Sequence, residues 1–391
     1  MLWQRLLYSS VAVWIFLLPW QTHYILAANT NQYQIISLYL TDVIWLVVMV
    51  LWLIHWYRQP RTTTLNVIGL ILLGGLVCLV GASAYWADNR DVSFYYWLRS
   101  IQASLVCIVA LTTAPPLPWL TLPLTSSGLV QAGLLFWQFF QQKVMANSWL
   151  GLAEQFPETA GVPVIVTDVG RWLRPFGSWP HPNTAGGWLV LCGVAAISLW
   201  YWQSGRWWRY ASLISTILIS AGIVLSFSRG AMMVWYVMLG AIVIAFGKAI
   251  WPIITVALIS TLIFMASFFN LWQSRIIASD FVEQYSLQQR HDQWQAVWPI
   301  IQQYWPRGVG MGHYPPEPIH FVPLLIAAEI GIFGAVLLYT LVAWSLRHRY
   351  EYVSVLLITI LLLGLFDHYL WTLPSMLLLW FYIIGLNLAK K

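Results

Sequence analysis

Long apolar segments, each about the length needed to cross a lipid bilayer, follow one another along almost the whole chain. A transmembrane helix needs ~20 mostly apolar residues in a row, and twelve segments of the sequence approach this length. Only 8% of the 391 residues are charged, whereas 60% are hydrophobic. One soluble core cannot bury that much apolar surface. The sequence therefore predicts an all-α, polytopic membrane protein, with residues 1–391 forming a single integral membrane domain.

Basic residues in the short loops indicate which side of the membrane each loop occupies. Cytoplasmic loops of membrane proteins are enriched in Lys and Arg. If the N-terminus is cytoplasmic, every basic cluster of the short loops falls inside, and we expect both termini in the cytoplasm. The twelve predicted spans are approximately 6–24, 34–56, 64–86, 97–113, 119–141, 185–203, 209–226, 230–247, 250–270, 322–345, 352–367 and 372–388. The basic residues that set the orientation are Arg58, Arg61, Arg206, Arg209, Lys248, Arg347, Arg349, Lys390 and Lys391.

Two predicted outer loops, 142–184 and 271–321, are far longer than the other connections. Loops of this length are usually functional or disordered, and the Trp and Pro content of both argues against disorder. In the second loop, apolar positions recur at helical spacing over residues 293–301, which predicts an amphipathic helix on the outer surface. The same loop concentrates the charged and histidine side chains that the spans lack. We therefore expect it to be an external catalytic loop.

Net charge and cysteine positions exclude several classes of partner. The formal charge is +6, but about half of the basic residues sit in short membrane loops, so nucleic acid is not expected as a partner. Cys78, Cys107 and Cys192 lie far apart in apolar runs, which indicates packing residues rather than a disulfide framework or a zinc site. No group of His, Cys and carboxylate residues has metal-ligand spacing. We therefore expect no metal site and no cofactor.

Arginines at the outer ends of spans are candidates for binding an anion. Arg229, within a Ser-Arg-Gly sequence, ends the seventh span, and an arginine drawn to the bilayer centre costs about 2.5–3.5 kcal/mol. It should therefore face a polar cavity or an anion, although snorkelling to lipid headgroups explains the same position. Arg290 opens the amphipathic stretch. Gly308 and Gly310 close it, and alternating glycines can turn backbone N–H groups toward a phosphate; a tight turn between two helices explains them equally well.

Histidine is the residue type that best fits acid or base chemistry here, and His320 is the strongest candidate. Pro315, Pro316 and Pro318 stiffen the chain before it, and a predicted span begins directly after it. Its ring should therefore be held at the mouth of the bundle. His313, beside the glycines, is the rival. No serine nucleophile elbow is present, which leaves general acid–base chemistry. The histidines on the predicted outer side are His23, His181, His291, His313, His320 and His368.

The order of these motifs resembles the O-antigen ligase and O-antigen polymerase superfamily of bacterial membrane glycosyltransferases. The resemblance covers residues 174–380, and no single motif is specific alone. After the signature histidine the family usually has a small polar amide, whereas this chain has Phe321. The matching motifs are the stretch from Arg174 to Asn183, Ser228-Arg229-Gly230, Arg290 with Trp294, Gly308 with Gly310 and Gly312, His320 with Glu329, Gly331 and Gly334, and Asp367-His368-Tyr369.

This resemblance implies an enzyme that moves a glycan from an undecaprenyl-diphosphate carrier to an acceptor hydroxyl, with inversion and without a metal or nucleotide cofactor. Such enzymes assemble surface polysaccharides, including lipopolysaccharide, and the resemblance implies a site on the periplasmic face of the bacterial inner membrane. The implied partners are the lipid-linked donor, a sugar or lipid-linked glycan acceptor, and membrane lipids.

Each candidate residue then receives an expected role. Arginine meets phosphate oxygens in bidentate geometry, so Arg229 and Arg290 are expected to bind the diphosphate. Histidine titrates near neutral pH, so His320 is expected to act as the general base. The resemblance adds further substrate-binding candidates, namely Arg174, Gly308, Gly310 and His313.

Two alternative functions stay open. A polymerase would use the same residues with a second lipid-linked repeat unit as acceptor, and the sequence does not separate it from a ligase. A transporter of lipid-linked glycan is the other alternative. It should place ionisable residues near the membrane midplane, whereas here they gather at the outer ends of the predicted spans.

Overall fold

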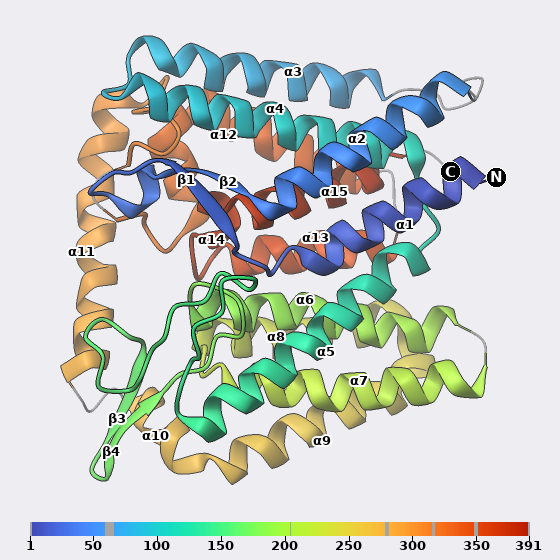
Figure 1. Cartoon of the computed structure of the whole chain (residues 1–391), viewed down its shortest axis with the longest axis vertical. Helices are drawn as coiled ribbons and strands as arrows, with labels where there is room; N and C mark the ends of the chain where they lie inside the picture. The colour runs from blue at the N-terminus through green and yellow to red at the C-terminus, as the bar shows by residue number, and fades with distance from the viewer. Residues whose placement is uncertain are drawn as a thin grey trace. The chain divides into compact units, whose positions relative to one another are not determined.

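Helices dominate the computed structural model (Figure 1), which describes residues 2–58, 66–203, 205–277, 281–314, 317–347 and 351–389, apart from the side chains of residues 281–283, 286 and 287. Eight helical stretches among these residues are long and apolar enough to cross a membrane. One of them, Arg229–Ser267, contains two helices, α8 (Arg229–Phe246) and α9 (Trp251–Ser267). The all-α class is confirmed and the chain is a multi-pass membrane protein, while the number of twelve spans stays a prediction.

Three further apolar helices are shorter, namely α1 (Leu2–Leu17), α13 (Glu351–Leu363) and α15 (Pro374–Leu388). At 1.5 Å per residue, the 15 residues of α15 rise about 22 Å. This is less than the ~30 Å hydrocarbon core of a bilayer. Each of the three overlaps a predicted span, so the hydropathy pattern located apolar helices even where it overestimated their length.

The chain folds into two compact units, which are described separately. The first unit comprises Met1–Leu7, His23–Pro115 and Gln289–Lys391. The second comprises Tyr8–Thr22 and Pro116–Gln288.

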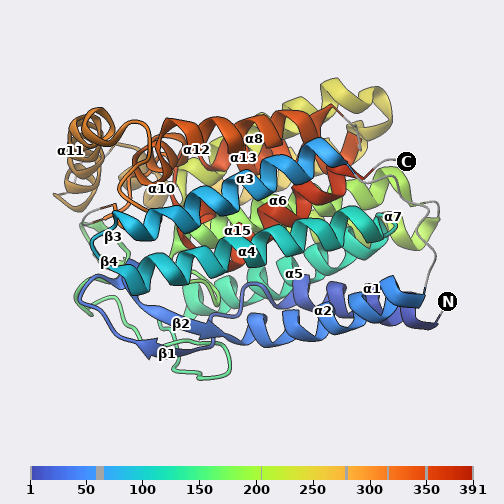
Figure 2. The same cartoon turned by 90° about the horizontal axis from the view of Figure 1, so that it is seen from above.

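Helix α15 forms the centre of the first unit. It packs against α4 (Arg90–Thr113), α12 (Val322–Leu346) and α13, and Figure 2 shows α4 beside it. All its side chains from Ser375 to Leu388 are buried, as expected of a helix that is apolar all round. A Cβ atom on Gly385 would lie 2.2 Å from the carbonyl oxygen of Cys107. Glycine is therefore required for α4 and α15 to pack this closely.

The first unit also contains a β-hairpin that leads into α2 (Leu40–Arg58). Its strands, β1 (His23–Ala27) and β2 (Ile36–Tyr39), pair antiparallel. A buried ion pair joins this region to α4: the Arg99 guanidinium lies 2.5 and 2.9 Å from the two carboxylate oxygens of Asp42. Arg99 also donates to the Ser37 carbonyl at 2.9 Å. The remaining long helix of this unit is α3 (Val67–Ala82), which packs against α4 and α12.

Replacing Arg99 with alanine should lower the free energy of unfolding of the first unit by about 3–5 kcal/mol, because the Asp42 carboxylate would stay buried without its ionic partner. Arg99→Lys should cost less, since the charge remains while the two-pronged geometry is lost. Thermal unfolding of the purified protein measures both changes. The matched control is Arg90→Ala, at the exposed start of the same helix. An equal loss in this control would contradict the prediction.

Helix α6 (Pro182–Trp202) forms the centre of the second unit. It packs against α5 (Pro118–Gln141), α7 (Arg206–Leu225) and α8, and nearly all its residues are buried. Pro182 starts the helix, a position where its missing N–H costs nothing. The His181 side chain caps the first turn by accepting from the Asn183 N–H at 3.1 Å.

The predicted outer loop 142–184 lies in the second unit and is ordered by two buried glutamines of α5. The Gln138 side chain accepts from the backbone N–H groups of Phe176 and Gly177 at 3.0 and 2.9 Å. The Gln131 side chain accepts from the Ser178 N–H at 2.9 Å. β3 (Val164–Thr167) and β4 (Gly170–Leu173) of this loop form a β-hairpin with a two-residue turn. Specific hydrogen bonds therefore hold this loop, while its place outside the membrane stays a prediction.

The predicted amphipathic stretch is part of helix α11 (Phe281–Tyr304). Gln293, Val297 and Ile301 recur every four residues and are buried, whereas Trp294 and Trp298 on another side are about half exposed. One face of the helix therefore packs on the first unit, to which residues 289–304 belong. In Figure 1, α11 runs across the direction of α3, α4 and α12. Its position relative to a membrane stays a prediction.

Candidate active site

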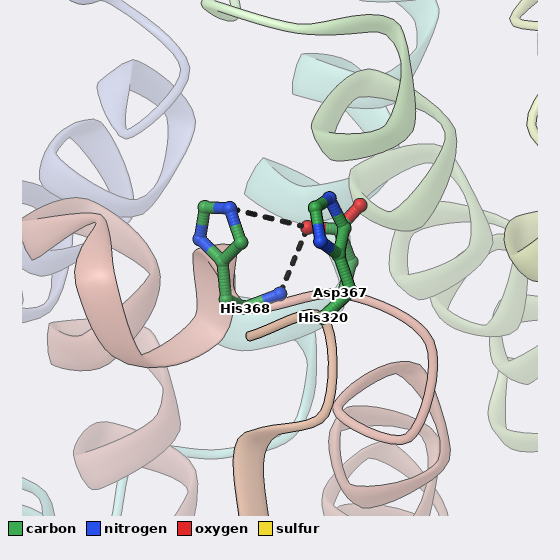
Figure 3. A group of neighbouring side chains, drawn as sticks. All are labelled: His320, Asp367 and His368. Carbon is green, nitrogen blue, oxygen red and sulfur yellow. Dashed lines mark hydrogen bonds and ion pairs between the residues drawn. The ribbon is translucent and has the colours of Figure 1, made fainter. Parts of the chain in front are cut away.

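Three titratable side chains, His320, Asp367 and His368, meet in the first unit (Figure 3). His320 lies directly before α12, while Asp367 and His368 lie between α13 and the short helix α14 (Tyr369–Thr372). The ring centroids of the two histidines are 5.0 Å apart. Asp367 is buried and the histidines are half-buried. We call these three residues the histidine–aspartate cluster.

Gln293 of α11 determines which nitrogen of His320 carries the proton. Its side-chain oxygen accepts from the backbone N–H of His320 at 3.3 Å and lies 2.9 Å from Nδ1 of the same residue. A backbone N–H needs an acceptor, so the amide oxygen, and not the amide nitrogen, must occupy this position. Nδ1 is therefore the donor, and Nε2 carries the lone pair. His320 thus presents a basic nitrogen in a fixed tautomer.

Burial lowers the pKa of both histidines. For His320, desolvation is the main cause; Asp367 raises the pKa, while the positive charge of Arg290 lowers it further. Burial lowers the pKa of His368 to about 4, again with Asp367 opposing and Arg290 adding to the shift. Both imidazoles are therefore neutral at neutral pH, so Nε2 of His320 can accept a proton.

Arg290 lies in α11, three residues before Gln293, and positions three apart share one side of a helix. Its charge acts on both histidines. The structure thus brings together two of the predicted site residues, Arg290 and His320. Pro315 and Pro316, which were expected to stiffen the approach to His320, lie outside the described residues.

Phe321, which stands where the family usually has a polar amide, contributes packing. Its ring lies 5.1 Å from the ring of Trp294 of α11. This contact joins the start of α12 to the helix that carries Arg290 and Gln293. Phe321 therefore supplies an apolar contact beside His320.

The glycine segment packs against a kink in α12. Gly331 has φ 70° inside that helix. The backbone N–H of the next residue, Ile332, donates to the Trp305 carbonyl at 2.8 Å. The N–H of Gly310 donates to the Glu329 carbonyl at 2.8 Å, and a Cβ atom on Gly308 would lie 2.3 Å from that carbonyl. These contacts favour the interpretation as a tight turn between helices. A substrate contact by Gly308 or Gly310 stays a prediction.

Glu329, of the Glu-x-Gly motif, holds this turn in place. Its buried carboxylate accepts from Trp371 Nε1 at 2.6 Å and from the backbone N–H groups of Gly312 and Tyr314. It therefore connects α12, the glycine segment and α14.

His313, the rival base, is engaged on both sides of its ring. Nδ1 lies 3.1 Å from the Met311 carbonyl oxygen, and Nε2 lies 3.0 Å from the Asn89 carbonyl oxygen. The residue is buried. These contacts are those of a packed, hydrogen-bonded histidine, so the geometry favours His320 as the base.

Arg229 and Arg174 lie in the second unit, at the turn between α7 and α8. Arg174 donates to the carbonyl oxygens of Ser226 and Phe227, both at 3.2 Å. Arg229 is the first residue of α8 and donates to the Arg275 carbonyl at 3.2 Å. Arg275, in α10 (Phe269–Ile277), donates to the same Phe227 carbonyl at 3.3 Å. Three arginines therefore gather around one turn, in which Phe227 has φ 49°.

Sequence reasoning missed Gln293 and Arg275. Gln293 is 27 positions from His320, and nothing in a helical pattern marks it as the partner of a distant ring. Arg275 had one available signal, because it is the only charged residue of α10.

The comparison with protein families gives a match, and no curated protein matches the chain. Residues 214–339 match the family described as O-antigen ligase. The matched segment runs from α7 to α12 and includes Arg229, Arg290, His320 and Glu329. Motif order and this match agree: the chain is a multi-pass membrane protein in which residues 214–339 are similar to the O-antigen ligase family.

Proposed function

We propose that this protein is an O-antigen ligase-like glycosyltransferase, which moves a glycan from an undecaprenyl-diphosphate carrier to an acceptor hydroxyl in surface polysaccharide assembly. The observation that carries the proposal is the His320 ring, whose Nδ1 is held by Gln293 and whose Nε2 is a neutral, half-buried base near the charge of Arg290. The family match supports the reaction class.

In the proposed reaction, the acceptor oxygen attacks the anomeric carbon of the donor sugar as its proton passes to Nε2 of His320. The bond between that carbon and the diphosphate oxygen breaks on the opposite face, so the sugar configuration inverts. The diphosphate leaves with the bonding electron pair, still attached to its lipid. The step requires no metal ion or cofactor.

Arginines provide the fixed positive charge for the leaving group. Negative charge develops on the diphosphate as the bond breaks, and preorganised cations stabilise it. We propose this role for Arg290 and for Arg229. Arg174 holds the turn before Arg229 through two carbonyl oxygens, and we propose that it supports the phosphate-binding conformation of this turn.

Surface glycans of a deletion strain test the function. Mass spectrometry of the lipid-linked intermediates should find full-length polymer stranded on the carrier. Single repeat units on the carrier would instead identify a polymerase, which would use the same base and arginines. Normal surface polysaccharide with no accumulated lipid-linked glycan would contradict both.

We propose a location in the bacterial inner membrane, with the active site on the periplasmic face. A cysteine at Val169, exposed at the tip of the β3–β4 hairpin, should react with an impermeant thiol reagent in intact cells. A cysteine at Gln203, at the end of α6, should react only after the membrane is opened. The unaltered chain, with its own three cysteines, is the control. The reverse labelling would contradict the orientation.

A further inference from the structure

The histidine–aspartate cluster presents three electron-rich atoms to one small space. One potential ligand atom from each of His320, Asp367 and His368 lies within 4.8 Å of the other two. Figure 3 shows the three side chains close together, with dashed lines from His368 to the Asp367 carboxylate. His320 is far in sequence from the adjacent Asp367 and His368, so no ligand spacing in the sequence indicates the group.

Both histidine rings are oriented through Nδ1. His320 Nδ1 donates to Gln293, as described above, and His368 Nδ1 lies 2.9 Å from the Thr372 hydroxyl oxygen. The Thr372 hydroxyl donates to the His368 carbonyl at 3.3 Å, so its oxygen accepts from Nδ1. In both rings Nε2 therefore carries the lone pair. Metal-binding histidines show this same arrangement, with the other ring N–H held by an outer partner.

The carboxylate is also oriented. Asp367 Oδ1 accepts from the backbone N–H of His368 at 2.8 Å and lies 3.9 Å from Nε2 of the same residue. At 3.9 Å this second contact is too long for a hydrogen bond. A nitrogen lone pair thus faces a carboxylate oxygen in a buried place, and a cation between the two would stabilise this arrangement.

We propose that His320, Asp367 and His368 form a binding site for a divalent transition-metal ion of the Zn²⁺ class, through the two Nε2 atoms and an Asp367 oxygen. Imidazole ligands suit this class of ion. Three protein ligands leave a fourth position open, as in catalytic zinc sites. Zinc bonds of 2.0–2.2 Å place tetrahedral ligands about 3.3–3.5 Å apart, so the side chains must close by roughly an ångström. The charges of Asp367 and Glu317 favour a cation here and that of Arg290 opposes it.

The site has a consequence that rests on the proposed function. A metal ion would occupy the same Nε2 of His320 that accepts the proton from the acceptor hydroxyl. Bound Zn²⁺ should therefore inhibit glycan transfer rather than assist it.

Calorimetric titration of Zn²⁺ into the purified, metal-free full chain tests the site. We expect one ion per chain. Asp367→Asn and His368→Gln should each weaken binding by more than about 100-fold, because loss of an outer partner alone costs 10–100-fold. Gln293→Ala, which keeps all three ligands, should weaken it by about 10–100-fold. The matched control is His291→Ala, an exposed histidine of α11, which should bind as the unaltered chain does.

Absence of binding by the unaltered chain would overturn the proposal, and so would equal binding by the Gln293, Asp367 and His368 variants. Thermal unfolding without metal identifies any ligand variant that fails to fold. In that case the zinc affinity of Gln293→Ala tests the site. Transfer measured at the binding concentrations of Zn²⁺ tests the consequence separately. Binding with unchanged transfer would keep the site and overturn its competition with the base, whereas no transfer even without metal would contradict the proposed function alone.

Discussion

Replacing His320 with alanine should reduce glycan transfer by about 10²–10⁴-fold, the usual contribution of a positioned general base. The reason is that Nε2 of this ring, fixed by Gln293 through Nδ1, is the atom proposed to take the acceptor proton. Binding of the lipid-linked donor should survive, because arginines hold the diphosphate. Purified variants, assayed separately for donor binding and for single-turnover transfer, measure the two steps.

Two comparisons make this result specific. Gln293→Ala should slow transfer less than His320→Ala, since the ring remains but loses its fixed tautomer. His291→Ala, on the exposed side of α11, should leave transfer unchanged. Transfer retained in His320→Ala but lost in a folded His313→Ala would move the base to His313. Loss of donor binding in His320→Ala would mean that this histidine positions substrate instead.

The apolar runs alone predicted most of the helices. The predicted spans 185–203, 209–226 and 322–345 correspond to α6, α7 and α12 within a few residues. These segments are predominantly apolar and end in polar or proline-containing sequence, so hydropathy marks both their presence and their ends.

The N-terminal region shows where hydropathy is insufficient. The first predicted span, 6–24, extends beyond the end of α1 at Leu17, because Pro19 cannot continue a helix. Likewise, residues 36–39 of the second predicted span form strand β2. A short apolar run fits a strand or a helix equally well, and only pairing with β1 decides between them.

The candidate site was predictable residue by residue but not as an arrangement. His320 could be selected from its place between a proline-rich segment and a span. Gln293, Asp367 and His368 could not be connected to it, because the packing of α11 and α14 around the start of α12 brings them together. For the glycines, the sequence allowed two interpretations, a phosphate-binding loop and a tight turn. The hydrogen bond from the Gly310 N–H to the Glu329 carbonyl favours the turn.

Replacing Arg290 or Arg229 with alanine should reduce transfer by about 10²–10³-fold or more, the effect of removing one donor that stabilises developing negative charge. Donor binding should weaken in both variants, in contrast to His320→Ala. Lysine keeps the charge but loses the planar fork that meets two phosphate oxygens, so Arg290→Lys and Arg229→Lys should keep part of the activity. Donor affinity and single-turnover transfer are measured on the same purified preparations.

Arg171→Ala is the matched control for Arg229, because it removes an exposed arginine of β4 from the same unit. It should bind donor and transfer glycan normally. An alanine variant of Arg229 that does the same would show that this arginine only anchors α8 at the membrane interface, the alternative that its position alone allows. Normal donor binding and transfer by Arg290→Ala would contradict the role proposed for this arginine. Another cation in the first unit would then have to stabilise the leaving diphosphate.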